Sequence, residues 1–242
     1  MRSLIRWGVA TGLAGATVLG TFAALPLKGL ALPQKDILEI LRPVPMFAIT
    51  DTNGKPVVLP QKNSQRTVSQ VFASKKAAEA ALLEVKQALG NVEVRPIPLS
   101  DVYNLEIEND NKPEGIDFVF VPVQSQVDIA KRIEKEFKGG TPLFYGQGAS
   151  GYLTLSDRQT GRQYIPFYFE SEQAAQLVRK FQQANPSLAN TAQVKVTSLE
   201  GAIQTLQQTD NAELKKVWLV PSQESIQFLR AEQQRRQGQS RR

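Results

Sequence analysis

Residues 165–175, Ile-Pro-Phe-Tyr-Phe-Glu-Ser-Glu-Gln-Ala-Ala, have a close counterpart elsewhere in the chain. Their bulky apolar run, typical of a β-strand, ends at Phe169, and Ser171 follows in a position suited to cap a helix that opens with an alanine pair. Ninety-seven residues earlier, residues 71–78 are Val-Phe-Ala-Ser-Lys-Lys-Ala-Ala, with phenylalanine, serine and the alanine pair in the same places. The stretch therefore predicts a strand–helix unit that the chain uses twice.

Further residues repeat in the same order. The offset of ninety-seven also joins Pro45 to Pro142, Phe47 to Phe144 and Gly54 to Gly151, and at about a hundred residues Val121-Pro122 recurs as Val220-Pro221. Matches in a fixed order indicate an internal duplication, and two long copies favour a two-lobed domain over a solenoid.

Each copy is expected to contain hairpins followed by strand–helix–strand units. In the first lobe we expect helices at 32–41, 75–89, 99–105 and 124–137, and strands at 44–49, 57–59, 67–72, 92–97 and 116–123, the last covered on both faces. In the second we expect strands at 142–145, 151–155, 164–169, 193–197 and 216–220, and helices at 171–184, at 199–207 and from 222. Hairpins give antiparallel pairs and crossovers give parallel pairs, so we predict an α+β fold with a mixed sheet.

The chain divides into four predicted parts. An export signal covers 1–31, the first lobe covers 32–140, the second lobe covers 141–229, and a basic disordered tail covers 230–242. The net charge of +6 resides in the ends, because 1–31 carry +3 and 230–242 carry +4, which leaves −1 for the body. A body without basic excess gives no indication of a nucleic-acid partner.

The first 31 residues resemble a targeting segment. Arg2 and Arg6 precede an uncharged run from Trp7 to Leu27, and small residues at Gly29 and Ala31 suit signal-peptidase cleavage after Ala31, with Ala23 or Ala24 as alternatives. The expected location is the periplasm, and the thylakoid lumen is the alternative. An uncleaved anchor in the inner membrane is a further alternative, because the run is just long enough to span a bilayer.

The chain contains no cysteine and no histidine. This excludes disulfides, thiol nucleophiles, zinc–thiolate sites, imidazole catalysis and Ser-His-Asp relays. Carboxylate, lysine or tyrosine chemistry, or a bound cofactor, is what remains for an enzyme. We therefore expect no enzyme activity, no cofactor and no metal.

Three motifs need to be weighed. Residues 146–151, Gly-Gln-Gly-Ala-Ser-Gly, match a dinucleotide-binding pattern, but a strand is expected after them where that site requires a helix, so we predict a hairpin loop. The serines at 100, 125 and 222 are expected to cap helices. Six carboxylates at 101–117 are expected in a solvated loop; calcium binding and carboxylate catalysis are the alternatives, although the spacing does not fit an EF-hand.

Aromatic residues provide the remaining candidates. Four at matching positions are expected in the core: Phe47, Phe72, Phe144 and Phe169. The strand at 164–169 presents aromatics to both faces, and Pro166 suits an edge strand because it lacks a donor. The candidate apolar surface for binding client proteins consists of Phe167, Tyr168, Tyr145 and Tyr152.

Seven short motifs together resemble the Tic22 family, the soluble component of the chloroplast inner-envelope protein translocon and its cyanobacterial homologues. They lie at residues 44–51, 71–74, 118–124, 141–144, 151–154, 165–170 and 220–225, and the resemblance covers nearly all of residues 37–232. The predicted N-terminal segment is an export signal and not a chloroplast transit peptide, and in this respect the chain resembles the cyanobacterial members of the family. The resemblance implies a bilobed fold with pseudo-twofold symmetry and apolar pockets, and it supplies no catalytic residue.

The resemblance also implies a chaperone-like role in moving proteins across the periplasm toward the outer-membrane barrel-assembly machinery. We therefore expect a non-enzymatic exported chaperone or translocation factor whose partners are unfolded or translocating proteins, with at most peripheral membrane contact. Two alternatives remain open. One is a periplasmic hydrolase that uses the 101–117 carboxylates, and the other is a peripheral membrane scaffold held by the N-terminal run and the arginine tail.

Overall fold

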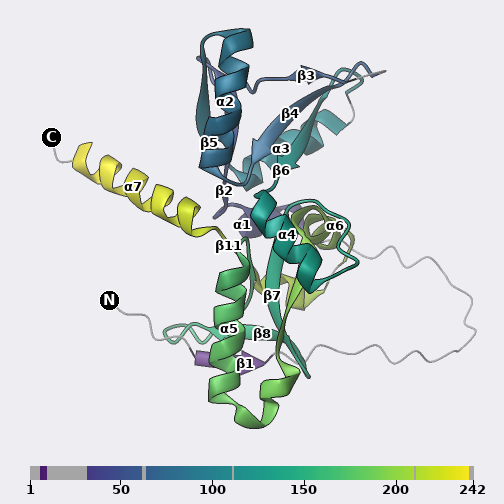
Figure 1. The fold of residues 1–242 in the computed structure, drawn as a ribbon, viewed down its shortest axis with the longest axis vertical. Helices are drawn as coiled ribbons and strands as arrows, with labels where there is room; N and C mark the ends of the chain where they lie inside the picture. Colours follow the sequence, from purple (N-terminus) through teal and green to yellow (C-terminus); the bar gives the residue numbers. More distant parts are fainter. Residues whose placement is uncertain (1–5, 10–31, 62–63, 111, 210, 240–242) are drawn as a thin grey trace, which may run out of the picture.

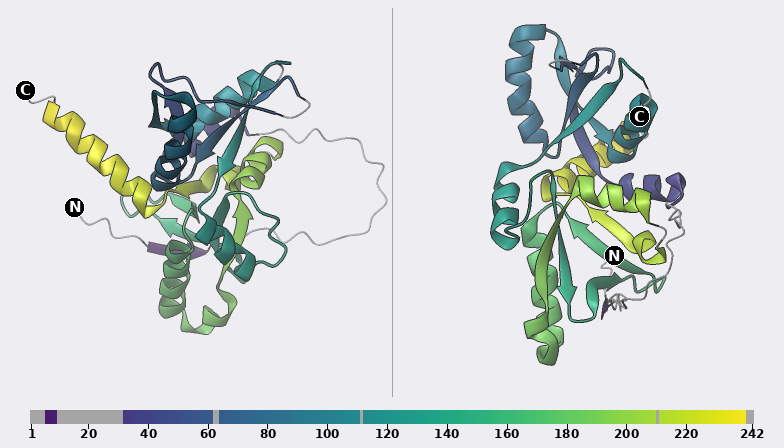
Figure 2. Two further views of the ribbon diagram at one scale, coloured as in Figure 1. Left: turned by 45° about the horizontal axis from the view of Figure 1, so that its top comes forward. Right: turned by 90° about the vertical axis from the view of Figure 1, so that its right-hand side faces the viewer.

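The structure, a computed structural model, describes residues 6–9, 32–61, 64–110, 112–209 and 211–239. Figure 1 shows two lobes, one above the other, each built on its own β-sheet. Helix α1 (Gln34–Leu41) lies at their junction, and α7 (Gln223–Gln239) extends away from the body in Figures 1 and 2.

The first lobe contains a sheet of order β3-β4-β2-β5, with β6 added in parallel beside β4. Its strands are β2 (Pro45–Asp51), β3 (Leu59–Pro60), β4 (Thr67–Phe72), β5 (Val92–Pro98) and β6 (Ile116–Val121). Its helices are α2 (Lys75–Leu89) and α3 (Leu99–Asp110), and α4 (Gln124–Ile133) follows β6.

The second lobe contains β7 (Pro142–Gly148), β8 (Gly151–Ser156), β9 (Gln163–Tyr168), β10 (Gln193–Ser198) and β11 (Val217–Val220). Its helices are α5 (Ser171–Ala184) and α6 (Leu199–Gln208), with short 3-10 turns η1 (Pro186–Thr191) and η2 (Ala212–Lys216). Strand β1 (Arg6–Val9) pairs antiparallel with β8.

The two sheets pair their strands in the same way. β5 and β10 lie antiparallel to β2 and β7, while β6 and β11 lie parallel to β4 and β9. A backbone hydrogen bond also corresponds, since the N–H of Leu99 donates to Val44 at 2.8 Å and that of Leu199 donates to Thr141 at 2.7 Å. The α+β class is therefore confirmed. An evolutionary duplication and a pseudo-twofold axis stay predictions, which this correspondence supports.

The largest apolar cluster joins the lobes. It contains the buried face of α1 with Ile37 and Leu41, together with Leu99 from the first lobe and Leu199 and Leu219 from the second. The last helix of each lobe also crosses over. Helix α4 packs on β7, β10 and α5, and Phe228 of α7 packs on Phe47 of β2.

Several local predictions are wrong. The helix expected at 99–105 continues to Asp110 as α3, so the carboxylates through 110 lie on a helix and not in a loop. The helix expected at 124–137 ends at Ile133. The tail expected to be disordered belongs to α7 as far as Gln239, because arginine, glutamine and glutamate favour helices even without an apolar face.

Two predictions about strands also need correction. Most of β6 is only partly buried, so it is not covered on both faces. Strand β9 lies between β7 and β8 on one side and β11 on the other, so Pro166 does not mark an edge strand. Alternate residues of a strand donate to opposite neighbours, so one proline removes one donor and leaves pairing on both sides intact.

The predicted export signal and its cleavage point after Ala31 lie almost wholly outside the described residues. Within the part of the chain that the structure describes, no helix has both the length and the apolar character required to cross a bilayer.

Candidate functional site

Three of the four predicted aromatic candidates form one cluster. The ring centroid of Tyr145 lies 5.2 Å from that of Tyr152 and 4.9 Å from that of Phe167, and the last two rings are 5.9 Å apart. The three rings line a small cavity of about 120 Å³ together with residues of α6 and β11. Tyr168 belongs to a different cluster, beneath α5, because successive residues of a strand face opposite sides of the sheet.

Burial limits what these aromatics can contact. Phe167 and Tyr168 are only 7% and 8% exposed, whereas Tyr152 is 37% exposed. Burial raises the pKa of the Tyr145 phenol to about 12 and raises the pKa of Tyr168 as well. Of the four, Tyr152 is the most exposed and Tyr145 is partly exposed, and contact with a client stays a prediction.

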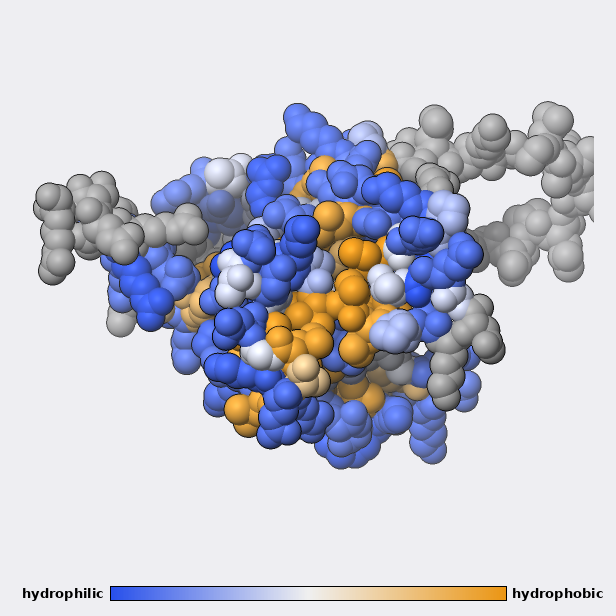
Figure 3. All heavy atoms as spheres, turned by 90° about the horizontal axis from the view of Figure 1, so that it is seen from above, coloured by the Kyte–Doolittle hydropathy of each residue, from blue (hydrophilic) through white to orange (hydrophobic). Residues whose placement is uncertain are grey.

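A second apolar surface lies on the first lobe. We call it the open cluster: Phe47, Ile49, Phe72 and Ala78 are buried, while Val57, Leu82, Val85, Val92 and Val94 pack against them and remain partly exposed. Figure 3 looks down on this lobe and shows apolar side chains reaching the surface in a continuous hollowed patch with polar borders. The sequence had suggested the apolar stripe of α2 but not its incomplete cover.

Helices α2 and α5 show why this lobe is open. They hold corresponding places after β4 and β9, but α5 buries five residues, among them Leu177 and Phe181, whereas α2 buries only Ala78. Leu83 and Leu89 on α2 are 67% and 57% exposed. The first lobe therefore leaves apolar area in contact with water, which is a property of interaction surfaces.

A third feature is a hollow between the lobes, of about 640 Å³. Its floor contains Val102, Ile107, Phe118, Phe120 and Ile203, from α3, β6 and α6. Three carboxylates line it as well: Glu106, Asp110 and Glu200. We call this site the inter-lobe hollow. No periodic pattern in the sequence brings α3 and α6 together, so this site was missed.

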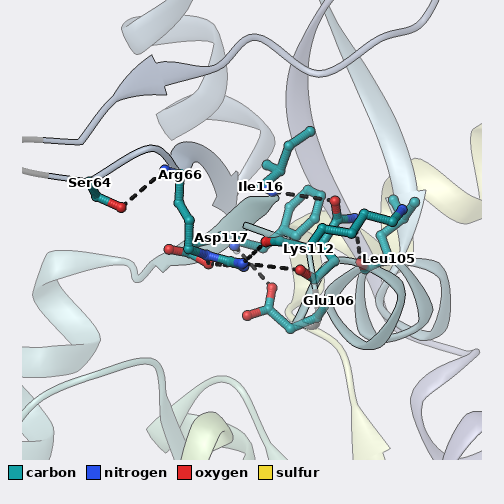
Figure 4. A network of polar contacts seen from close by, with 9 residues as sticks. Ser64, Arg66, Leu105, Glu106, Lys112, Ile116 and Asp117 are labelled. Atoms are coloured by element: carbon teal, nitrogen blue, oxygen red, sulfur yellow. Dashed lines mark hydrogen bonds and ion pairs between the residues drawn. The ribbon is translucent and has the colours of Figure 1, made fainter. Parts of the chain in front are cut away.

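The carboxylates of 101–117 do not form one centre. Figure 4 shows Arg66 clamping the α3–β6 turn: Nε donates to Asp117 at 2.7 Å, and Nη1 donates to the carbonyls of Asn109 and Lys112 at 3.1 and 2.7 Å. Asp101, Glu108 and Asp110 are exposed. The role that the structure shows for Asp117 is therefore to hold the turn in place.

Glu106 lies partly buried on α3, where its carboxylate accepts a backbone hydrogen bond from β6. Burial raises the pKa, and the hydrogen bond that Glu106 accepts from the N–H of Phe118 at 3.0 Å opposes the rise. Within the described residues, no group of three or more acidic side chains is placed to hold a metal ion. Nothing in this geometry favours the hydrolase alternative.

The glycine-rich motif at 146–151 forms the turn of a hairpin, as predicted. Strands β7 and β8 pair across it, and Gly151 has a φ of 119°, in the region that favours glycine. Ser74 and Ser222 accept hydrogen bonds from Ala77 and Ser225, which confirms both as caps. The expectation for Ser100 and Ser125 is wrong, because each is the second residue of its helix, α3 or α4. Ser171, expected to cap α5, is instead its first residue, and its N–H donates to the side chain of Gln126.

Comparison with known proteins agrees with this architecture. Two solved structures are similar. Anabaena Tic22, described with protein transport, has a TM-score of 0.72 and 23% sequence identity, and the match covers 83% of this chain and 97% of that chain. Tic22 from Plasmodium falciparum has a TM-score of 0.63 and 23% sequence identity, and the match covers 80% of this chain and 95% of that chain. The chloroplastic protein TIC 22-like of Arabidopsis thaliana is 23% identical over 202 residues, 80% of this chain and 62% of that relative.

The chain thus spans less than two thirds of the curated relative's length. The family model described as the Tic22-like family matches residues 12–231, nearly the whole chain. The chain belongs to the Tic22-like family.

Proposed function

We propose that this protein is a non-enzymatic factor that binds unfolded or translocating polypeptides through its incompletely covered apolar surfaces. The open cluster of the first lobe is the observation that supports this most directly. The exposed Leu83 and Leu89 of α2 adjoin the partly exposed residues of this cluster. Covering this area with a client's apolar side chains is favourable by about 25 cal/mol per Å² of apolar area removed from water. Such binding is reversible and requires neither a nucleotide nor a covalent step.

The location and the receiving partner are part of the same proposal. The predicted export signal supports action in the periplasm, and the resemblance to the cyanobacterial branch supports transfer of clients toward an outer-membrane barrel-assembly factor. The description of Anabaena Tic22 with protein transport is consistent with this role. Contact with a membrane is proposed to be peripheral at most.

The test is light scattering of an outer-membrane barrel protein diluted from denaturant, with and without the full chain. We expect suppression of aggregation near an equimolar ratio. The variant Leu83→Ser with Leu89→Ser should lose most of this suppression while its thermal unfolding stays close to that of the wild type, because both leucines are largely exposed.

A matched control is Leu188→Ser in η1 of the second lobe, where another leucine is exposed. This variant should suppress aggregation as the wild type does. Absence of suppression by the wild-type chain at several-fold excess would refute client binding. Equal loss in both variants would show that the first lobe is not the binding surface.

A further inference from the structure

Helix α1 binds a site on the second lobe, and the corresponding site on the first lobe has no helix bound to it in the part of the chain that the structure describes. Helix α1 packs against α6, β11 and α3 and buries Ile37, Ile40 and Leu41 among them. In the strand pairing described above, β6 is the counterpart of β11, and α3 and α6 are counterparts of each other. The site that corresponds to the α1-binding site, when each element is replaced by its counterpart in the other lobe, therefore lies between α3, α6 and β6. These elements line the inter-lobe hollow.

Strands β11 and β6 differ in how far their apolar side chains are buried. On β11, Leu219 packs in the same cluster as α1 and is only 1% exposed. On β6, Phe118 and Phe120 remain partly exposed and line the hollow. Gly139 and Gly140, just before β7, also line it, and they stand where Arg42 and Pro43 precede β2. In the described part of the chain, no helix is seated there as α1 is seated on β11.

The charge of the hollow also differs from that of the α1-binding site. Helix α6 opens with the buried Leu199, and Leu206, seven residues later, is buried as well. The carbonyl of Leu206 accepts a hydrogen bond from the N–H of Leu32. Helix α3 opens with the corresponding Leu99, but the residue seven positions later is Glu106, which lines the inter-lobe hollow with Asp110 and Glu200. The residues that line the hollow include no lysine or arginine. A matching occupant therefore carries positive charge beside its apolar face.

We propose that the inter-lobe hollow binds a short amphipathic helix of another polypeptide, similar in size to α1, with lysine or arginine flanking its apolar face. Helix α1 has eight residues, and the hollow of about 640 Å³ lies in the range of binding pockets. The inference rests on the proposed function and adds which client segments are preferred. Because burial raises the pKa of Glu106, a cation placed beside this carboxyl relieves an unfavourable charge.

The test uses the full chain and two labelled peptides of about 14 residues, long enough for partial helicity. Both carry leucines at i, i+3, i+4 and i+7. One has lysines beside them and the other has glutamates. Fluorescence anisotropy should give a dissociation constant about 10-fold lower for the lysine peptide, with the difference shrinking at high salt. Equal binding of the two peptides would overturn the inference.

Two variants of α3 locate the site. Asp110→Lys reverses a charge that lines the hollow, whereas Glu108→Lys makes the same change at an exposed residue of the same helix outside its lining. We expect Asp110→Lys to weaken binding of the lysine peptide about 10-fold and Glu108→Lys to change it less than about 2-fold. Equal effects of both would place the peptide elsewhere and overturn the inference.

Two further measurements separate the remaining outcomes. If Asp110→Lys instead dissociates a self-associated form in sedimentation, the occupant is a second copy of this chain and the inference is wrong. The light-scattering assay distinguishes failure of the inference from failure of the proposed function. Equal binding of the peptides with aggregation still suppressed refutes only the charge preference, whereas absence of both activities refutes client binding itself.

Discussion

Glu106 links the local fold to pH at the scale of single residues. Its carboxyl pKa is raised above the usual 4.5, chiefly because burial disfavours the charged form. The folded state therefore binds a proton more tightly than the unfolded state. Its contribution to stability is greatest at low pH and declines as the pH rises from the unfolded pKa through the folded pKa.

Glu106→Gln should consequently gain stability relative to the wild type as the pH is raised from about 3.5 to 7. The amide oxygen can still accept from the N–H of Phe118, so the hydrogen bond is retained. Urea unfolding of both proteins at the two pH values measures the difference. Glu170→Gln should change in the same direction, since burial raises the pKa of that carboxyl too. A relative loss of stability with rising pH would contradict the assignment.

At the scale of elements, the start of α2 is held by residues from both lobes. Ser74 Oγ accepts from Ala77 at 3.3 Å and donates to Glu224 of α7 at 2.7 Å, while the other oxygen of Glu224 accepts from the N–H of Lys76 at 2.9 Å. A carboxylate at a helix N-terminus is favourable because unpaired N–H groups point toward it. The cap of α2 is therefore also a connection to α7.

Ser74→Ala should lower the unfolding free energy by about 1 kcal/mol, which corresponds to a Tm lower by about 2–4 °C in a chain of this size. Ser125→Ala, at an exposed serine in the first turn of α4, is the control and should leave Tm nearly unchanged. Differential scanning calorimetry of the three proteins provides the comparison. An equal fall in Tm at both serines would show that Ser74 contributes nothing as a cap.

At the scale of the whole molecule, exchange of α4 and α7 between the lobes should make unfolding cooperative. Phe228 of α7 meets Phe47 of β2 edge to face, with ring centroids 5.4 Å apart, although α7 follows the last strand of the second lobe. Helix α4 buries Ala130 in the core of the second lobe, although it follows the last strand of the first. Each lobe is thus completed by a helix of the other.

Phe228→Ala should therefore destabilise both lobes together, by about 1–2 kcal/mol for a partly buried ring. Hydrogen exchange at β4 and at β9 monitors urea unfolding of each lobe separately. The urea midpoints of the two strands should coincide within the wild type and also within the variant. If β4 lost protection at a lower urea concentration than β9, the lobes would be independent units.

The sequence predicted the elements whose information is local. Strand β4 and helix α5 have the expected bounds, and α5 ends before Pro186 as its sequence predicted, although Ser171 does not cap it. The α+β class and the hairpin at the glycine-rich motif follow from the same patterns. Helix α3 was predicted too short because the polar residues from Glu106 to Asp110 also suit a loop, and the clamp by Arg66 that favours the helical turn comes from a distant residue.

By itself, the sequence determined the order of strands and helices, the absence of thiol and imidazole chemistry, and the presence of repeated segments. Tertiary structure alone decided which apolar residues stay open. Phe167 and Tyr168 are both buried, on opposite faces of β9, while α2 leaves leucines in water and α3 and α6 enclose a hollow. The physical reason is that periodicity shows which side chains share a face, whereas exposure depends on whether a second element, such as α1 on β11, packs over that face.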